Sequence, residues 1–231
     1  MNASHPLIDG RQSLDLFQRV AEFNLYLVRY IDSTWLKTVK LSPLVSQLRK
    51  AGNADFHLSH YLLTQFSLHE DYDYDFEEPA KRIVLAKTEV LLETATYIGI
   101  ILNEDVIRNA VRRDERAALE QCLGADAYRF AVKKAQFVSR AASKQGPSLL
   151  IDWNHLQRFK QYLQTSGVQV IGKAFSQAPL SFRKRLELKL PQSCKDALTN
   201  TSTVNLSETD CVNLLVKTYR EVDKEWRLLL S

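Results

Sequence analysis

The sequence has 231 residues, long enough for one large domain or for two small domains that each bury a core. Apolar residues make up 45% and charged residues 25%, a balance that excludes an intrinsically disordered chain. Only seven Gly and six Pro occur, so the turn residues that β-rich proteins need are scarce and a helical fold is favoured.

The formal net charge of +4 is unevenly distributed. Residues 1–80 hold 7 basic and 11 acidic residues, whereas residues 81–231 hold 24 basic and 16 acidic residues. The densest basic stretch, residues 125–189, has 12 Lys or Arg against three acids. Such asymmetry is typical of proteins that bind nucleic acid, a membrane surface or an acidic protein, and also of two halves that attract each other.

The first third of the chain predicts helices up to an acidic segment. Apolar residues recur at three- and four-residue spacing over residues 14–31, with Ser13 as the expected N-cap. Pro43 is expected in the first turn of a short helix, and residues 55–65 predict another. The acidic segment, residues 66–79, follows as a loop or a short extended stretch.

The rest of the chain also reads as helices. A long helix is expected over residues 81–102, and a second runs from Asn103 as N-cap to Gly124 as the residue after its end. Ser166 and Gly167 are expected to close a later helix, and Ser207 with Asp210 resembles a capping box. The remaining helices are expected over residues 125–143, 151–163, 168–177, 180–190 and 208–229.

These elements predict an all-α or predominantly α fold, an irregular multi-helix bundle. Composition and charge change near Pro79, which places a soft boundary there. We therefore expect an N-terminal helical region over residues 1–80 and a main helical bundle over residues 81–231, packed as one globular unit. We find no signal peptide, and no apolar run reaches the roughly 18 to 20 residues that span a bilayer.

The acidic segment carries six carboxylates without a basic residue between them: Glu70, Asp71, Asp73, Asp75, Glu77 and Glu78. Its D-x-D-x-D pattern suggests a calcium loop that begins at Asp71. Such a loop needs Gly at its sixth position and Glu at its twelfth, where this chain has Phe76 and Arg82. The spacing therefore argues against calcium.

Aromatic residues alternate with the carboxylates of this segment. In an extended chain, Tyr72, Tyr74 and Phe76 would share one side and the carboxylates the other. The aromatic side would then anchor the segment on the helices. Both a solvated acidic loop and a partner-binding surface fit this pattern.

Enzyme sites have little support in the sequence. His57 and His60 are three residues apart, which leaves open a small metal-dependent enzyme that also uses the acidic cluster, but zinc needs more convergent ligands. The chain lacks a G-x-S-x-G elbow and Gly-rich phosphate loops. The odd number of cysteines, without C-x-x-C spacing, favours reduced thiols. We expect no catalytic residues, no metal and no cofactor.

Basic residues recur along the expected helices, among them Arg112, Arg113 and Arg116. A phosphate-binding stripe would look similar, so a basic nucleic-acid-binding regulator is an alternative. However, we find no helix-turn-helix or other known DNA-binding motif in the sequence. A solvated face or a surface for an acidic protein partner is the preferred interpretation.

Three segments together resemble a known family. Residues 66–79 read FSLHEDYDYDFEEP, residues 99–111 read GIILNEDVIRNAV, and residues 185–191 read RLELKLP. In this order and spacing they are similar to the SctK family, called YscK in one branch, an accessory cytoplasmic protein of bacterial type III secretion systems. Residues 1–63 and the final helix carry no segment of this resemblance.

The resemblance implies a mostly helical, non-enzymatic adaptor of the cytosolic sorting platform of the injectisome. It implies a place in the bacterial cytoplasm at the inner membrane, without insertion into it and without nucleic acid. The implied partners are the cytoplasmic domain of an SctD-like ring protein and an SctQ-like pod protein, with an SctL-like stator as a further candidate. The residues that we expect at partner-binding surfaces are Phe66, Asp71, Tyr72, Asp73, Tyr74, Asp75, Phe76, Glu77, Glu78, Arg112, Arg113 and Arg116.

Overall fold

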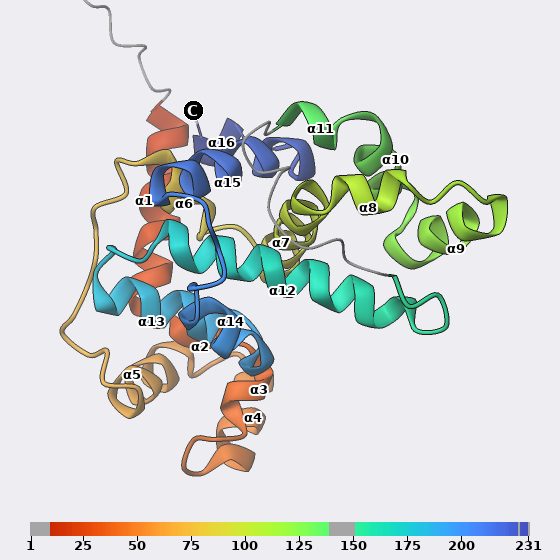
Figure 1. The fold of residues 1–231 in the computed structure, drawn as a ribbon. Helices are drawn as coiled ribbons and strands as arrows, with labels where there is room; N and C mark the ends of the chain where they lie inside the picture. Colours follow the sequence, from red (N-terminus) through yellow and green to blue (C-terminus); the bar gives the residue numbers. More distant parts are fainter. Residues whose placement is uncertain (1–9, 139–150, 226, 231) are drawn as a thin grey trace, which may run out of the picture. The chain divides into compact units, whose positions relative to one another are not determined.

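The computed structural model describes residues 10–138, 151–225 and 227–230 (Figure 1). Over these residues the chain forms helices and loops without a strand, so the predicted predominantly α fold is confirmed. The acidic segment connects α5 to α6, and its residues 66–78 contain neither helix nor strand. The part of the predicted helix over residues 125–143 that follows Val138 lies outside the described residues.

The chain divides into two compact units. Unit 1 consists of Met1–Thr88, Pro179–Gln192 and Lys224–Ser231, and unit 2 consists of Glu89–Ala178 and Ser193–Asp223. The first boundary lies close to the one expected near Pro79, but two later segments return to unit 1. Unit 1 is therefore built from three separate stretches of sequence.

Unit 1 is a set of mostly short helices around an apolar core. The core is centred on Leu27, Leu62 and Trp35 and includes Leu188 from the second stretch of the unit. Its helices are α1 Gly10–Leu25, α2 Leu27–Tyr30, α3 Ser33–Leu36, α4 Ser42–Ala51, α5 Asp55–Gln65, α6 Pro79–Ile83, α13 Leu180–Lys189 and α16 Arg227–Leu230. The predicted short helices at Pro43 and over residues 55–65 are confirmed as α4 and α5.

The predicted helix over residues 14–31 starts at Gly10 rather than after Ser13, and it breaks at Tyr26. In an unbroken helix the amide of Val28 would donate to the carbonyl of Asn24. Instead the Val28 amide donates to the Ser59 hydroxyl, and the Asn24 carbonyl accepts from Arg185. Two tertiary hydrogen bonds thus replace one helical hydrogen bond. The apolar spacing of residues 14–31 could predict neither of these two bonds, because both partners lie elsewhere in the chain.

The predicted helix over residues 81–102 is also broken, into α6 and α7 (Thr88–Leu102). The carbonyl of Val84 would accept from Thr88 in a continuous helix, but it accepts from the ammonium group of Lys189 at 2.7 Å. The Thr88 hydroxyl in turn donates to the Lys189 carbonyl. A buried lysine therefore interrupts the helix.

Unit 2 is organised around its longest helix, α12 (Leu156–Ala174), against which α14 and α15 pack (Figure 1). Its other described elements are most of α7, α8 Glu104–Arg108, α9 Arg113–Leu123, α10 Ala125–Lys133, α11 Ala135–Val138, the last residues of the 3-10 turn Gln192–Cys194, α14 Lys195–Thr199 and α15 Glu208–Val222.

The predicted stop at Ser166 and Gly167 is wrong, because α12 continues through both residues. Gly167 lies where α12 crosses α7, and a Cβ there would be 1.8 Å from the carbonyl oxygen of Ala95. On α7, a Cβ at Gly99 would be 1.9 Å from the carbonyl oxygen of Leu163. Both glycines allow two backbones to approach closely, a role that sequence cannot distinguish from a helix end.

Other helix ends follow local chemistry. Gly124 follows α9 at φ 96°, as predicted, and Ser207 caps α15 by accepting from the Asp210 amide at 3.1 Å. Asn103 precedes α8 but does not cap it, since its side chain donates to the Gly99 carbonyl. The predicted helix from Asn103 to Gly124 is divided into α8 and α9. The predicted final helix ends at Val222, where Asp223 turns extended.

Candidate functional site

The acidic segment is a shaped loop within unit 1. Ser67 and Glu70 adopt left-handed φ angles of 56° and 68°, which turn the chain sharply after α5. Leu68, Asp73 and Phe76 are its buried side chains. These three inward side chains fix the course of the loop.

The predicted alternation of aromatic and acidic sides is wrong. Tyr72 and Tyr74 are exposed, at 41% and 54%, whereas the carboxylate of Asp73 between them is buried. Only Phe76 among the three aromatics points inward. Tyr72 and Tyr74 do share a side, but the bonds that Asp73 makes to Asn24 and Lys81 turn this residue inward and leave the two tyrosines facing out.

Asp73 is held by α1 and α6. The Asn24 side chain donates to the Asp73 carbonyl at 2.7 Å and accepts from its amide at 2.9 Å. The Lys81 ammonium lies 2.9 Å from the Asp73 carboxylate, and both groups are almost fully buried. The carboxylate also accepts from the Asp75 amide. This residue therefore ties the loop to unit 1.

Phe76 anchors the loop through an aromatic cluster. Its ring lies 5.8 Å from Phe23 on α1 and 6.0 Å from Phe182 on α13, measured between ring centroids. The Lys81 ammonium lies 5.3 Å from the centroid of the Phe76 ring, a cation–π contact. The Phe76 carbonyl accepts from Arg82 at 2.7 Å.

Arg185 joins the first and third segments of the family resemblance. It is 0% exposed, and one guanidinium nitrogen donates to the carbonyls of Asn24 and Leu68 at 3.3 Å each. Its guanidinium carbon lies 5.8 Å from the centroid of the Tyr72 ring. Burial lowers the pKa of Arg185, while its neighbour Tyr30 opposes that shift.

Lys189, one helical turn after Arg185, is also buried. Its ammonium donates to the Val84 carbonyl and lies 5.5 Å from the centroid of the Tyr30 ring. Burial raises the pKa of Tyr30, whose hydroxyl donates to the Phe23 carbonyl. We call Lys81, Arg185 and Lys189 the cation frame, because each holds a carbonyl, a carboxylate or a ring of a neighbouring segment.

The sequence prediction missed the cation frame. A usable signal was the helical period of α13, which places Arg185 and Lys189 on the same face as the apolar Phe182 and Leu186. Cations at core positions of an amphipathic helix indicate buried hydrogen bonds rather than a solvated face.

The exposed part of the loop forms what we call the acidic–aromatic surface. The rings of Tyr72 and Tyr74 lie 6.2 Å apart at their centroids. Its exposed residues are Glu70, Asp71, Tyr72, Tyr74, Asp75, Glu77 and Glu78. Phe66 is not among them, since its half-buried ring packs against Trp35.

The three predicted arginines lie in unit 2, on α9 or just before it, and are exposed. Arg112 is 4.0 Å from the Glu115 carboxylate, and Arg116 donates to the Ala110 carbonyl at 3.1 Å. The structure therefore does not place them in the same unit as the acidic–aromatic surface.

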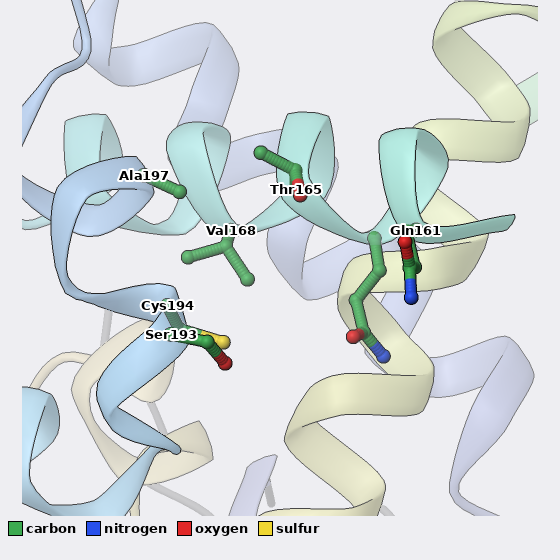
Figure 2. Close-up of a pocket in the computed structure, with 7 residues that line it drawn as sticks. Gln161, Thr165, Val168, Ser193, Cys194 and Ala197 are labelled. Atoms are coloured by element: carbon green, nitrogen blue, oxygen red, sulfur yellow. The ribbon is translucent and has the colours of Figure 1, made fainter. Parts of the chain in front are cut away.

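A pocket of about 360 Å³ lies within unit 2 between α12 and the start of α14 (Figure 2). Its lining residues are neutral: Gln161, Gln164, Thr165, Val168, Ser193, Cys194 and Ala197. These side chains hold no acid–base pair. The thiol of Cys194 is half-buried, whereas Cys122 and Cys211 are buried, and burial raises the pKa of Cys211 to about 11.

Metal ligands do not cluster in the described part of the chain. Among residues 10–138, 151–225 and 227–230, no group of three or more His, Cys, Asp and Glu could hold a metal ion. His57 and His60 are exposed on α5. Within the same residues, every helix is too short or too polar to cross a membrane.

Comparison with known proteins gives a family match. A family model described as "YOP proteins translocation protein K (YscK)" matches residues 19–231, nearly the whole chain. No curated protein and no solved structure matches the chain. The match also covers α2 to α5 and the final helices, which carried no segment of the sequence resemblance.

Proposed function

The chain belongs to the YscK family of type III secretion translocation proteins, and from this premise we propose that it is a non-enzymatic adaptor of the cytosolic sorting platform. In this role it links an SctD-like ring protein to an SctQ-like pod protein at the cytosolic face of the inner membrane. An SctL-like stator is a further candidate partner. The family match over residues 19–231 is the observation that carries the proposal.

The acidic–aromatic surface is the first docking site in this proposal. Exposed tyrosines contribute large contact areas at low entropic cost, and they are enriched among residues that dominate binding energy. The carboxylates around Tyr72 and Tyr74 favour a partner with basic side chains and speed its encounter. A lysine or arginine of that partner could also stack on the tyrosine rings.

The cation frame supports this site indirectly. Arg185 holds the Leu68 carbonyl at the start of the loop, and Lys81 holds the Asp73 carboxylate at its middle. A loop that is already fixed loses less conformational entropy when a partner binds. The exposed tyrosines are therefore presented from a fixed backbone.

An adaptor needs a second surface, and unit 2 offers the exposed arginines Arg112, Arg113 and Arg116. Bidentate guanidinium contacts suit an acidic partner. Asp114 and Glu115 interrupt this row, so recognition there would be local rather than through a broad positive field.

The test is binding of the purified full chain to the pod protein and to the cytoplasmic domain of the ring protein. We expect Tyr72→Ala with Tyr74→Ala to weaken one of these complexes by about 2 kcal/mol or more, roughly thirtyfold in Kd. Arg112→Glu with Arg113→Glu should weaken the other complex. Calorimetry or biolayer interferometry measures both.

Exposed aromatics elsewhere supply a matched control. Phe56→Ala with Tyr162→Ala removes two exposed rings outside the proposed surfaces and should leave both affinities unchanged. The adaptor proposal fails if the unaltered chain binds neither component at low and moderate salt. The assignment to the acidic–aromatic surface fails if the control variant weakens binding as much as the tyrosine variant.

A further inference from the structure

A second exposed feature of unit 1 consists of residues that connect α3 to α4 and of residues on α4, far from α6 and α16 in Figure 1. Leu41 is 65% exposed and Leu44 is 48% exposed. Single exposed leucines are common on protein surfaces and need no explanation. Two observations set this pair apart: backbone strain and the charge around it.

Leu41 adopts a left-handed conformation, φ 57° and ψ 31°, which is unfavourable for a residue with a branched side chain. Buried side chains hold it there: Val39 and Val45 enter the core of unit 1 on either side. The Lys40 carbonyl also accepts from the Tyr61 hydroxyl at 2.8 Å. Because Val39 and Val45 are fixed in the core, the side chain of Leu41 between them stays exposed to solvent.

Along the chain, the charged residues that flank the two leucines have one sign. Residues 33–54 contain no Asp or Glu, and their basic residues are Lys37, Lys40, Arg49 and Lys50. Arg49 points inward to the Ile31 carbonyl, while the three lysines are exposed. We call Lys37, Lys40, Leu41, Pro43, Leu44 and Lys50 the basic–apolar tip.

We propose that the basic–apolar tip rests on the surface of a membrane that contains anionic lipids. Lysines attract anionic headgroups, and exposed leucines enter the boundary between headgroups and acyl chains. A lipid surface accepts outward-pointing side chains without a preformed pocket, whereas an acidic protein would need a groove shaped for both leucines. This contact is peripheral, and it does not rest on the proposed adaptor function, which uses other residues.

The test is co-sedimentation of the full chain with vesicles of phosphatidylcholine alone or with about one third phosphatidylglycerol, at about 50 mM and about 300 mM salt. We expect binding to the anionic vesicles at low salt, weaker binding at high salt, and little binding to neutral vesicles. Lys37→Glu with Lys40→Glu should weaken binding by about twentyfold or more, at about fivefold for each lysine lost.

Matched variants separate the tip from net charge. Lys87→Glu with Lys224→Glu makes the same charge change at exposed sites outside the tip and should weaken binding much less. Leu41→Ser with Leu44→Ser should weaken it by about tenfold, while Leu180→Ser, at another exposed leucine, should not. Leu41→Gly relieves the left-handed strain, so it should weaken binding while thermal unfolding stays at or above its original midpoint.

Several results would overturn the proposal. The first is failure of the unaltered chain to bind anionic vesicles at low salt, and the second is equal binding to neutral vesicles. Equal losses in the tip and control charge variants would reduce the effect to net charge. Binding to polyglutamate that depends on the tip, without binding to vesicles, would assign the tip to an acidic protein instead.

Discussion

The segments inside unit 1 and the helices inside unit 2 are packed together by different means. In unit 1, the cation frame inserts charged side chains between segments and satisfies carbonyls that would otherwise be buried without partners. In unit 2, Gly99 and Gly167 lack the side chain that would keep α7 and α12 apart. Gly172 does the same for α12 and α14, since a Cβ there would be 2.1 Å from the carbonyl oxygen of Leu198. Unit 1 therefore depends on the hydrogen bonds of buried charged side chains, and unit 2 depends on glycines that have no side chain.

This difference shows that two groups of helices can lose stability on substitution for different physical reasons. Where two helices cross at a glycine, any added side chain destabilises the packing. The protein interior is packed as densely as an organic crystal and leaves no room for the extra atoms. A buried cation fails when its partners lose their hydrogen bonds, because each unsatisfied buried group costs about 1–3 kcal/mol. Substitutions in each unit can separate these two costs.

The largest effect is expected for Gly167→Ala in unit 2. Helix propensity alone would stabilise the protein by about 1 kcal/mol. The clash with the Ala95 carbonyl should outweigh this gain and lower the free energy of unfolding by about 3–5 kcal/mol. Chemical denaturation measures the sign. Ser166→Ala, at the neighbouring half-buried residue, removes a hydroxyl that bonds only to the Tyr162 carbonyl of the same helix, and it should change stability by less than about 0.5 kcal/mol. A stabilised Gly167→Ala variant would refute the close crossing.

The next effect is expected for Arg185→Met in unit 1. Methionine fills a similar volume but leaves the carbonyls of Asn24 and Leu68 without their donor, at a cost of about 3 kcal/mol. The matched variant is Arg183→Met, on the exposed side of α13, which should cost less than about 0.5 kcal/mol. Equal costs for both variants would show that the buried guanidinium contributes nothing specific.

A smaller effect is expected for Asp73→Asn. The Asn side chain can still accept from the Asp75 amide, but the buried ammonium of Lys81 loses its nearer counter-charge and keeps only the exposed Asp75 carboxylate at 3.9 Å, at a cost of about 2 kcal/mol. Asp71→Asn, at an exposed position, should leave thermal unfolding unchanged. The pair also separates support from docking: Asp71→Asn tests the surface, and Asp73→Asn tests the connection beneath it.

The smallest effect is expected for Ser207→Ala, which removes the cap of α15 in unit 2. The loss of one exposed capping bond should cost about 1 kcal/mol. Ser207→Asp keeps an acceptor at the same position and should restore most of the stability. A loss as large as that of Arg185→Met would mean that polar contacts matter equally in both units.

The sequence predicted features whose causes are local. The helix over residues 55–65, the cap at Ser207 and the end at Gly124 depend on neighbouring residues, and all three are confirmed. The breaks at Tyr26 and after Ile83 were not predicted, because Arg185 and Lys189 cause them from more than 100 positions away. The role of Gly167 was also misread, because it depends on the Ala95 backbone of another helix.

The candidate surfaces divide in a similar way. Exposure of the carboxylates in the acidic segment followed from composition alone, and Asp71, Asp75, Glu77 and Glu78 are exposed. The burial of Asp73 could not be predicted from composition, since it depends on Asn24 and Lys81 from two helices. The basic–apolar tip was missed because the sequence before Pro43 gives no sign of the left-handed backbone that Leu41 adopts or of its exposure.

The three-stretch construction of unit 1 has a consequence for the order of events during synthesis. Leu68 leaves the ribosome 117 residues before Arg185, the residue that donates to its carbonyl. At about 5–20 residues per second, this delay is roughly 6–23 s. During that time the loop is made but its guanidinium partner is not, so a nascent chain stopped before α13 should expose the acidic segment to proteases that the finished chain resists.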